Sequence, residues 1–183
     1  MGKITFILGG ARSGKSSFAL ALTKKKAGRT AFIATCRPLD EEMKRRIALH
    51  RAKRPSDWRT FEEPLQLSAL VKKISPKFRV LIIDCLTLFI SNILLKGHSD
   101  NVIEKRVIEL LKILKKLKCN SILIANEVGL GVVPESKLGR KFRDLAGRIN
   151  QTVAGLADEV FFITAGIPLK IGTSKGKNPT LDC

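Results

Sequence analysis

The chain has no tyrosine and a single tryptophan, and its other aromatic residues are nine phenylalanines. Proteins that hold single-stranded nucleic acid usually stack its bases on aromatic rings, so this scarcity argues against such a module. Long apolar runs are missing as well. The longest, at 86–95, is interrupted by Ser91 and Asn92 and is much shorter than the roughly 20 residues of a membrane span. The sequence therefore predicts no membrane span, and we expect no nucleic-acid partner.

Cysteine is scarce, and its spacing forms no recognisable motif. No C-x-x-C pair occurs among the four cysteines, Cys36, Cys85, Cys119 and Cys183, which argues against a zinc site or a disulfide framework. The first three residues lead directly into an apolar run, so no secretory signal is evident. These observations favour a reducing compartment, and we expect a cytoplasmic protein.

Acidic residues are few. The chain has 16 Asp and Glu against 34 Lys and Arg, a formal net charge of +18. Such a surplus attracts nucleic acid, membrane surfaces or anionic substrates, and its distribution matters more than its sum. Lysines at 24–26, at 72–73 and at 115, 116 and 118 fall on or near expected helix faces or ends, where solvated surface is the simpler interpretation. Residues 44–54, KRRIALHRAKR, differ because they place a histidine among cations.

The length of 183 residues and the 44% hydrophobic content suit one well-buried domain, which we expect at 1–171, followed by a flexible tail at 172–183. Strands such as 80–83 are apolar on both faces, which is typical of a parallel sheet covered by helices on both sides. Residues 163–171 predict an antiparallel hairpin at the sheet edge. The fold class is therefore α/β. Hydrophobic periodicity predicts strands at 3–8, 30–35, 79–84, 120–126 and 159–164, and helices at 15–27, 39–52, 65–74, 86–96, 101–118 and 138–157.

The most informative segment, residues 9–16, reads GGARSGKS and matches the phosphate-binding motif G-x-x-x-x-G-K-[ST]. An apolar strand precedes it and a helix follows it, as that chemistry requires. The loop's backbone N–H groups and the helix N-terminus favour phosphate oxygens. We expect Lys15 to reach the β- and γ-phosphates and Ser16 to hold Mg²⁺. The other residues expected to contact the nucleotide here are Gly9, Gly10, Ala11, Arg12, Ser13 and Gly14.

Two carboxylates follow predicted strands and are expected at the same edge of the sheet. Asp84 ends the buried strand, and in P-loop proteins such an aspartate helps to hold Mg²⁺. The alternative for Asp84 is a cap for the next helix. Glu127 follows the strand at 120–126, and it either orients the acceptor hydroxyl or serves as a structural loop carboxylate. Three arginines, Arg140, Arg143 and Arg148, are most simply a solvated helix face.

A histidine segment follows at 50–63, HRAKRPSDWRTFEE. The imidazole of His50 can attack phosphorus and carry a phosphoryl or nucleotidyl group covalently. The cations beside it can neutralise a triphosphate. Trp58 either packs the loop down or borders a nucleotide. Glu62 is either an exposed charge or an acceptor for guanine N–H groups.

Taken in order, these motifs resemble one family. GGARSGKS, HRAKRPSDWRTFEE, LIIDCLT, ANEVGLGVVPES and FRDLAGRINQ follow one another as in the bifunctional adenosylcobinamide kinase / adenosylcobinamide-phosphate guanylyltransferases of cobalamin biosynthesis. The resemblance extends over residues 3–171. Its pattern H-R-x-x-R-P-x-x-W-x-T-x-E is far more discriminating than the phosphate loop, which many unrelated enzymes share.

The resemblance implies a RecA-like P-loop fold, a homotrimer, and two reactions on a corrinoid substrate. A nucleoside triphosphate, ATP or GTP, phosphorylates adenosylcobinamide. His50 then takes GMP from GTP, and the phosphorylated corrinoid accepts it to give adenosylcobinamide-GDP. Cys36 departs from the small hydroxyl residue expected there. Besides residues 9–16, the positions that match contacts to GTP are Ala34, Thr35, Cys36, Arg51, Ala52, Lys53, Arg54, Glu62 and Asp84.

Two other classes of protein remain in view. The basic pI of about 10.2 and the RecA-like core would also suit a P-loop ATPase that binds nucleic acid, but that reading leaves the segment at 50–63 unexplained. A non-catalytic nucleotide-binding regulator would show no turnover, although Lys15, Ser16, Asp84 and His50 are all present.

Overall fold

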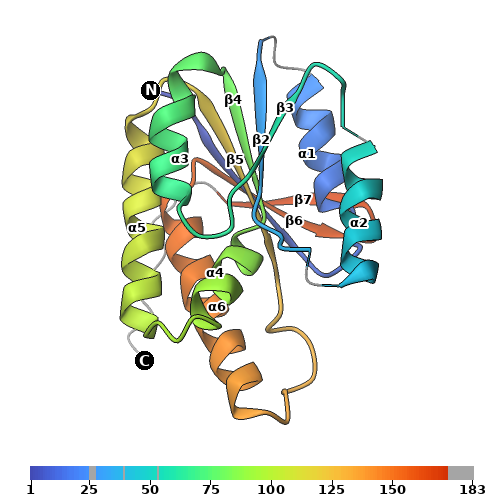
Figure 1. The fold of residues 1–183 in the computed structure, drawn as a ribbon, viewed down its shortest axis with the longest axis vertical. Helices are drawn as coiled ribbons and strands as arrows, with labels where there is room; N and C mark the ends of the chain where they lie inside the picture. The colour runs from blue at the N-terminus through green and yellow to red at the C-terminus, as the bar shows by residue number, and fades with distance from the viewer. Residues whose placement is uncertain (25–27, 39, 53, 173–183) are drawn as a thin grey trace.

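The computed structural model describes residues 1–24, 28–38, 40–52 and 54–172 (Figure 1). Strands and helices alternate along most of the chain, as the apolar pattern predicted. The elements are β1 (Ile4–Gly9), α1 (Lys15–Lys24), β2 (Thr30–Ala34), α2 (Glu41–Ala52), β3 (Arg59–Glu62), α3 (Leu67–Ile74), the 3-10 helix η1 (Ser75–Lys77), β4 (Val80–Asp84), α4 (Leu86–Leu94), α5 (Asp100–Lys116), β5 (Asn120–Asn126), α6 (Lys137–Leu156), β6 (Glu159–Thr164) and β7 (Ile167–Gly172).

These strands form one sheet in the order β3-β2-β4-β5-β1-β6-β7. Every neighbouring pair is parallel except β6 and β7, which are antiparallel, so the predicted α/β class and the closing hairpin are confirmed. Gly9 lies opposite Asn126, and Ala34 lies opposite both Asp84 and Glu62. The register therefore brings the carboxyl ends of β1 to β5 to one edge of the sheet. Each of these strands ends in, or leads into, a segment that the sequence predicted as part of the site.

Helices cover both faces of the sheet, with α3 to α6 on one side and α1 and α2 on the other (Figure 1). The strands alternate accordingly. In β1, Phe6 and Leu8 join the core under α3 to α6, whereas Ile7 joins the smaller core under α1. Because burial on both faces removes all contact with water, the strands read as continuous apolar runs, which is why they were predictable.

The apolar run at 86–95 is an internal helix. Phe89, Ile90 and Ile93 of α4 are buried in the core. Asn92, which interrupts the run, is also buried, and its amide donates to Thr35 O at 2.8 Å and to Pro64 O at 3.3 Å. Across the described part of the chain, no helix combines the length and apolar character needed to cross a bilayer.

The sequence did not predict β3. This four-residue strand is partly exposed and lies at the sheet edge, so its side chains carry no clear alternation. Pairing with β2 creates it, and that pairing sets Glu62 beside Ala34. The expected helical residues 25–27 and 39, and the expected tail from 173 onward, lie outside the described residues.

Candidate active site

The phosphate-loop motif joins β1 to α1 and has a conformation that needs glycine. Gly9 and Gly14 have φ values of +154° and +103°. A Cβ on Gly9 would lie 2.3 Å from the Ile163 carbonyl oxygen, and one on Gly14 would lie 3.2 Å from Gly166 Cα. Gly166 N also donates to Ser13 O at 2.9 Å, so the tip of the β6–β7 hairpin supports the loop. The sequence did not indicate this support.

Lys15 lies inside the curve of the loop. Its side chain is buried at 7% exposure, and its ammonium donates to Gly9 O at 2.9 Å and also to Gly10 O. The N-terminus of α1, which begins at Lys15, points its partial positive charge at the same place. A buried cation, a helix N-terminus and a tight glycine loop together form a phosphate cradle.

Ser16 and Asp84 meet beside the loop. The Ser16 hydroxyl donates to Asp84 Oδ2 at 3.1 Å. Burial raises the pKa of Asp84, and the Ser16 hydrogen bond and the charges of His50, Arg54 and Lys15 oppose that rise. A buried carboxylate with a raised pKa is stabilised by a cation, and a hydroxyl beside a carboxylate is the hard-oxygen pair that Mg²⁺ prefers. The two side chains therefore fit the expected metal.

A metal ion held by Ser16 and Asp84 would need further ligands from a bound nucleotide. Among the described residues, no group of three or more His, Cys, Asp or Glu side chains is placed to hold an ion. Mg²⁺ commonly takes one or two protein oxygens and completes its shell with phosphate oxygens and water. The site thus suits a metal that arrives with a nucleotide.

Thr35 supports the site from within. It is fully buried; its hydroxyl donates to Cys85 O at 2.7 Å and accepts from Cys85 N at 2.9 Å. Its backbone N–H donates to Asp84 O, and its carbonyl accepts from Asn92. Thr35 therefore ties the end of β2 to the end of β4, and its expected contact with the nucleotide stays a prediction. Ala34 is buried beside it, and the half-buried Cys36 Sγ donates to Arg37 O at 3.7 Å.

His50 lies in the last turn of α2, with Arg51 next to it. This helix is exposed along most of its length, and even Leu49 is 66% exposed, so little of its surface is held by the core. His50 is nevertheless among the charges that act on Asp84, which places the end of α2 toward the phosphate-loop edge. Ala52 is exposed at the same end, and Lys53 lies outside the described residues.

Arg54 is fixed more firmly than His50. Its guanidinium lies 3.7 Å from the centre of the Phe32 ring and donates to Thr60 Oγ1 at 3.1 Å. Burial lowers its pKa, while the charges of Asp84 and Glu62 oppose that change. Trp58 stacks on Phe32 with ring centres 6.4 Å apart, so it packs the segment onto the core. Arg54 is thereby held between the core and the acidic groups of the site.

Glu127 is positioned against the phosphate loop. Its backbone N–H donates to Gly9 O at 3.0 Å. Its carboxylate accepts from Gly129 N at 2.8 Å and from the Asn150 amide at 3.4 Å. Asn150 is buried on the core face of α6, and the sequence reasoning missed it. An amide on an otherwise apolar helix face was the signal that could have revealed it.

The three arginines of α6 have partners of their own. Arg148 pairs with Asp100 and Glu104, and Arg143 pairs with Asp144. Arg140 donates to the carbonyls of the preceding loop. Their interpretation as structural surface is supported.

Known proteins resemble this chain over nearly its whole length. The family described as cobinamide kinase / cobinamide phosphate guanyltransferase matches residues 5–171. The bifunctional adenosylcobalamin biosynthesis protein CobP of Pseudomonas aeruginosa is 44% identical over 165 residues, which cover 90% of this chain and 95% of that protein. The bifunctional adenosylcobalamin biosynthesis protein CobU of Escherichia coli is 37% identical over 177 residues, covering 90% and 97%.

Solved structures show the fold alone. A type III secretion ATPase of pathogenic bacteria superimposes with a TM-score of 0.58 at 12% identity, covering 93% of this chain and 57% of that one. A KaiC-like protein of Pyrococcus horikoshii gives 0.51 at 14% identity, covering 87% and 70%. The predicted RecA-like P-loop fold is thereby confirmed.

Proposed function

Since the chain belongs to the cobinamide kinase / cobinamide phosphate guanyltransferase family and so has both activities, we propose that it carries out both reactions at the carboxyl edge of its sheet, with His50 as the guanylyl carrier. The observation that carries the proposal is the convergence on Asp84: Ser16 bonds to it, and Lys15, Arg54 and His50 all act on its charge. Phosphate-loop, metal-site and nucleophile residues thus share one locality.

In the kinase step, a nucleoside triphosphate lies with its β- and γ-phosphates against residues 9–16. Lys15 and the loop N–H groups hold the phosphates and neutralise charge on the transferred group. When bound, Mg²⁺ adds charge neutralisation at the phosphates, and Ser16 and Asp84 are the residues that would hold it. The substrate hydroxyl attacks the γ-phosphorus and loses its proton as the new P–O bond forms.

We assign Glu127 as the general base that accepts the proton of the substrate hydroxyl. Its carboxylate is oriented by Gly129 N and Asn150, and its backbone is tied to Gly9, so it is fixed relative to the bound phosphates. A general base must lie within reach of the hydroxyl and hold its position through the reaction. The arrangement favours the catalytic interpretation of Glu127 over the purely structural one.

In the guanylyl step, the His50 imidazole attacks the α-phosphorus of GTP and pyrophosphate leaves. A P–N bond forms and the α–β P–O bond breaks, leaving GMP on the histidine. A phosphate oxygen of the phosphorylated corrinoid then attacks the same phosphorus, and the imidazole is released. Arg54 and Arg51 neutralise the phosphates from the α2 side. The exposed α2 lets His50 approach the nucleotide without disturbing the core.

A labelling experiment tests the carrier role. The protein is incubated with Mg²⁺ and GTP labelled at the α-phosphate, then denatured and assayed for acid-labile label retained on the chain. We expect label on the wild type and none on His50→Ala. Absence of label from the wild type, together with a nucleic-acid-stimulated ATPase activity, would contradict the proposal.

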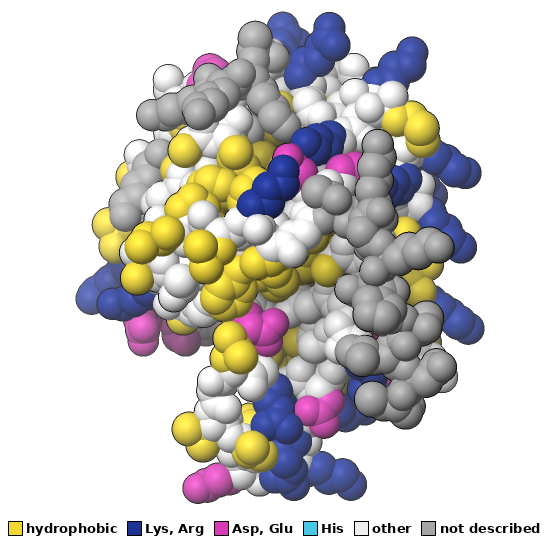
Figure 2. Space-filling view, turned by 180° about the vertical axis from the view of Figure 1, so that it is seen from behind, with side chains coloured by type: hydrophobic (Ala, Val, Ile, Leu, Met, Phe, Trp, Pro, Cys, Tyr) yellow, Lys and Arg dark blue, Asp and Glu magenta, His cyan; other side chains and the backbone are white. Residues whose placement is uncertain are grey.

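We also propose that the protein assembles as a homotrimer, which the family resemblance implies. Hydrophobic side chains gather over a broad area of one face (Figure 2). Exposed apolar residues occur in alternation on β7, at Ile167, Leu169 and Ile171, and in the loop after β5, at Val132 and Val133. Patches of this kind mark association surfaces in soluble proteins. Light scattering on the eluting protein should give three times the chain mass of 20.2 kDa, and a monomeric mass would contradict it.

A further inference from the structure

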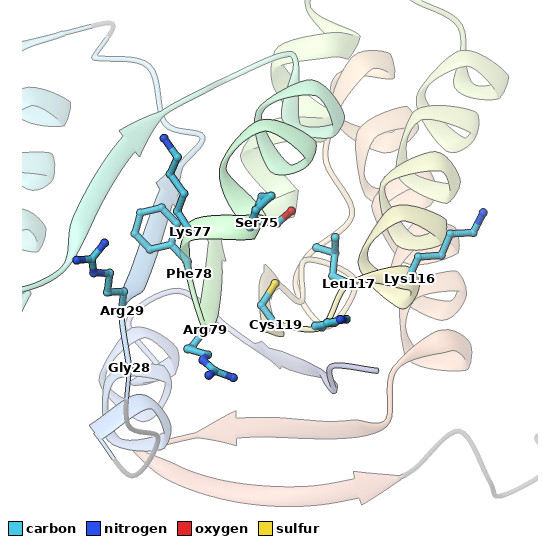
Figure 3. A pocket seen from close by; sticks show the side chains of 11 residues that line it. Gly28, Arg29, Ser75, Lys77, Phe78, Arg79, Lys116, Leu117 and Cys119 are labelled. Atoms are coloured by element: carbon cyan, nitrogen blue, oxygen red, sulfur yellow. The ribbon is translucent and has the colours of Figure 1, made fainter.

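A concave site lies at the edge of the sheet opposite the phosphate loop, where the strands begin. It has a volume of about 760 Å³, which is within the range of small-ligand sites. Its walls come from the turn before β2, from η1 and the turn before β4, and from the connection between α5 and β5 (Figure 3). We call it the amino-edge pocket. None of the residues assigned to the two reactions lines it.

The rim of the amino-edge pocket is strongly basic. Its lining includes five cations and, in the part of the chain that the structure describes, no Asp or Glu: Arg29, Lys77, Arg79, Lys116 and Lys118. Figure 3 shows Arg29, Lys77 and Arg79 on one side and Lys116 on the other, with Leu117 and Cys119 between them. A basic rim around an apolar floor suits an anion that also offers some apolar or planar surface.

The sheet itself sets the spacing of these cations. Thr30 pairs with Val80, and Val80 pairs with Asn120, so three adjacent strands start at one level. Arg29 and Arg79 immediately precede the first two, and Lys118 lies two residues before the third. Because neighbouring strands lie about 4.8 Å apart, the three cations are brought into a row about 10 Å long at the backbone.

Backbone hydrogen bonds fix the starts of these three strands relative to one another. Arg79 N and Val80 N both donate to Arg29 O, and Asn120 N donates to Arg79 O. The stem of Arg79 also packs on Gly28, where a Cβ would come within 2.6 Å of it. Gly28 has φ of +123°, so a larger residue would be strained there as well as crowded.

These charges have no counterions in the described part of the protein. The five rim cations take part in none of its ion pairs. The acids nearby are already used, because Asp158 pairs with Lys115 and Glu159 pairs with Lys3 and Lys170. Lys116 lies in the last turn of α5, where the partial negative charge of the helix C-terminus stabilises a cation. Arg29, Arg79 and Lys118 precede strands, so no helix C-terminus in the described part of the chain stabilises them in this way.

We propose that the amino-edge pocket binds a small anion carrying a di- or triphosphate group, independently of the phosphate loop. Several full positive charges on neighbouring strands match a chain of linked phosphates, which carries several negative charges over a short distance. The group can belong to a nucleoside polyphosphate or to an inorganic polyphosphate. In either case the site is separate from the catalytic edge, so its ligand does not compete with the substrate nucleotide.

Calorimetric titration of the full chain with sodium tripolyphosphate at low ionic strength tests this site. We expect two binding sites per chain. Lys15→Ala should remove the phosphate-loop site and leave the other. Arg79→Gln with Lys118→Gln should weaken the second site about tenfold or more and leave the first, because two exposed charge contacts are lost. This pair should label at His50 like the wild type.

A control double variant distinguishes binding at the amino-edge pocket from non-specific attraction to the net positive charge of the protein. Lys96→Gln with Lys105→Gln removes the same charge near the far end of α5, and it should leave both sites unchanged. Equal weakening by the two pairs, or a single site that Lys15→Ala abolishes, would overturn the proposal. The conservative pair Arg79→Lys with Lys118→Arg should retain binding, which keeps the test valid if the glutamine pair is poorly folded.

The two sources of the ligand are distinguished in the Lys15→Ala protein. Tighter binding of GTP than of tripolyphosphate at the remaining site identifies a nucleoside polyphosphate as the ligand. Equal or weaker binding of GTP identifies an inorganic polyphosphate. If neither compound binds there, the proposal is wrong.

Discussion

The Ser16 hydroxyl donates to Asp84 Oδ2 at 3.1 Å, although the two residues lie 68 positions apart. One begins the helix after the phosphate loop, and the other ends a strand that is separated from β1 by β5. Their contact joins the nucleotide cradle to a buried carboxylate. The pKa of Asp84 therefore depends on the charges around the cradle, which include Lys15, Arg54 and His50.

The first prediction concerns the stability of the ligand-free protein. Burial raises the pKa of Asp84, so the folded chain keeps this proton to a higher pH than the unfolded chain. Ionisation of Asp84 therefore lowers the free energy of unfolding as the pH rises from the unfolded-state pKa through the folded one. Asp84→Asn should raise the melting temperature at neutral pH in EDTA, and the gain should disappear in acid, where both side chains are neutral.

The same variant should be a poor enzyme. The substitution removes the carboxylate that we propose as a Mg²⁺ ligand, and we expect both activities to fall by roughly 100-fold. Calorimetry across pH, with activity assays at saturating Mg²⁺, checks both effects. A lower melting temperature at neutral pH would show that ionised Asp84 stabilises the empty site.

The second prediction concerns the separation of the two activities. His50→Ala should keep its kinase activity close to that of the wild type, because the proposed mechanism uses His50 only for attack on the α-phosphorus of GTP. Lys15→Ala should lower both activities by roughly 100-fold, since we propose that both reactions use the phosphate cradle. Separate assays of corrinoid phosphorylation and of guanylyl transfer measure this. A well-folded His50→Ala protein that lacks kinase activity would refute the division of roles.

The third prediction concerns Glu127. Glu127→Gln keeps the shape of the side chain but cannot accept a proton, so phosphorylation should fall roughly 100-fold or more. Guanylylation of His50 requires no deprotonated hydroxyl and should persist. Asn150→Ala should lower kcat of the kinase less severely by releasing the carboxylate. Equal loss of both activities in Glu127→Gln would instead indicate a structural role for this residue.

The fourth prediction concerns Arg54. Its guanidinium stacks on Phe32 and interacts with the charges of Asp84 and Glu62. Arg54→Gln should raise KM for GTP by about tenfold, because it removes the cation that we propose contacts a phosphate. Arg59→Gln is a matched control, because Arg59 stacks on Phe61 at 5.4 Å outside the phosphate site. Steady-state kinetics compare the two variants. A similar rise in KM for both would point to loss of general charge.

The fifth prediction concerns the loop glycine. Gly14→Ala should destabilise the protein by about 1–3 kcal/mol, because alanine is strained at φ +103° and its Cβ meets Gly166. Nucleotide binding should be lost with the loop geometry. Gly147→Ala is the control: its Cβ meets no atom within 4 Å in α6, and it should stabilise by about 0.5–1 kcal/mol. Urea unfolding measures both changes, and equal effects would contradict the strain argument.

Much of the site was predictable because its signals are local. Residues 9–16 carry their own geometry, and their function depends on the strand and helix directly beside them. Asp84 was predictable because it ends an apolar strand. The structural role of Thr35 was not predictable, because its hydrogen bonds to Cys85 join residues that lie 50 positions apart in the sequence.

The sequence by itself determined the α/β class and the phosphate-loop motif, because each depends on periodicity or on a contiguous motif, and the family resemblance of residues 50–63 is the basis for proposing His50 as the guanylyl carrier. Only the tertiary structure decided what these residues meet. The sheet order brings Ser16 to Asp84, ties Glu127 to Gly9 and Asn150, and sets the hairpin tip on the loop. It also gathers Arg29, Arg79 and Lys118 at the opposite edge. Such contacts depend on which strands become neighbours, and that choice comes from packing the whole core.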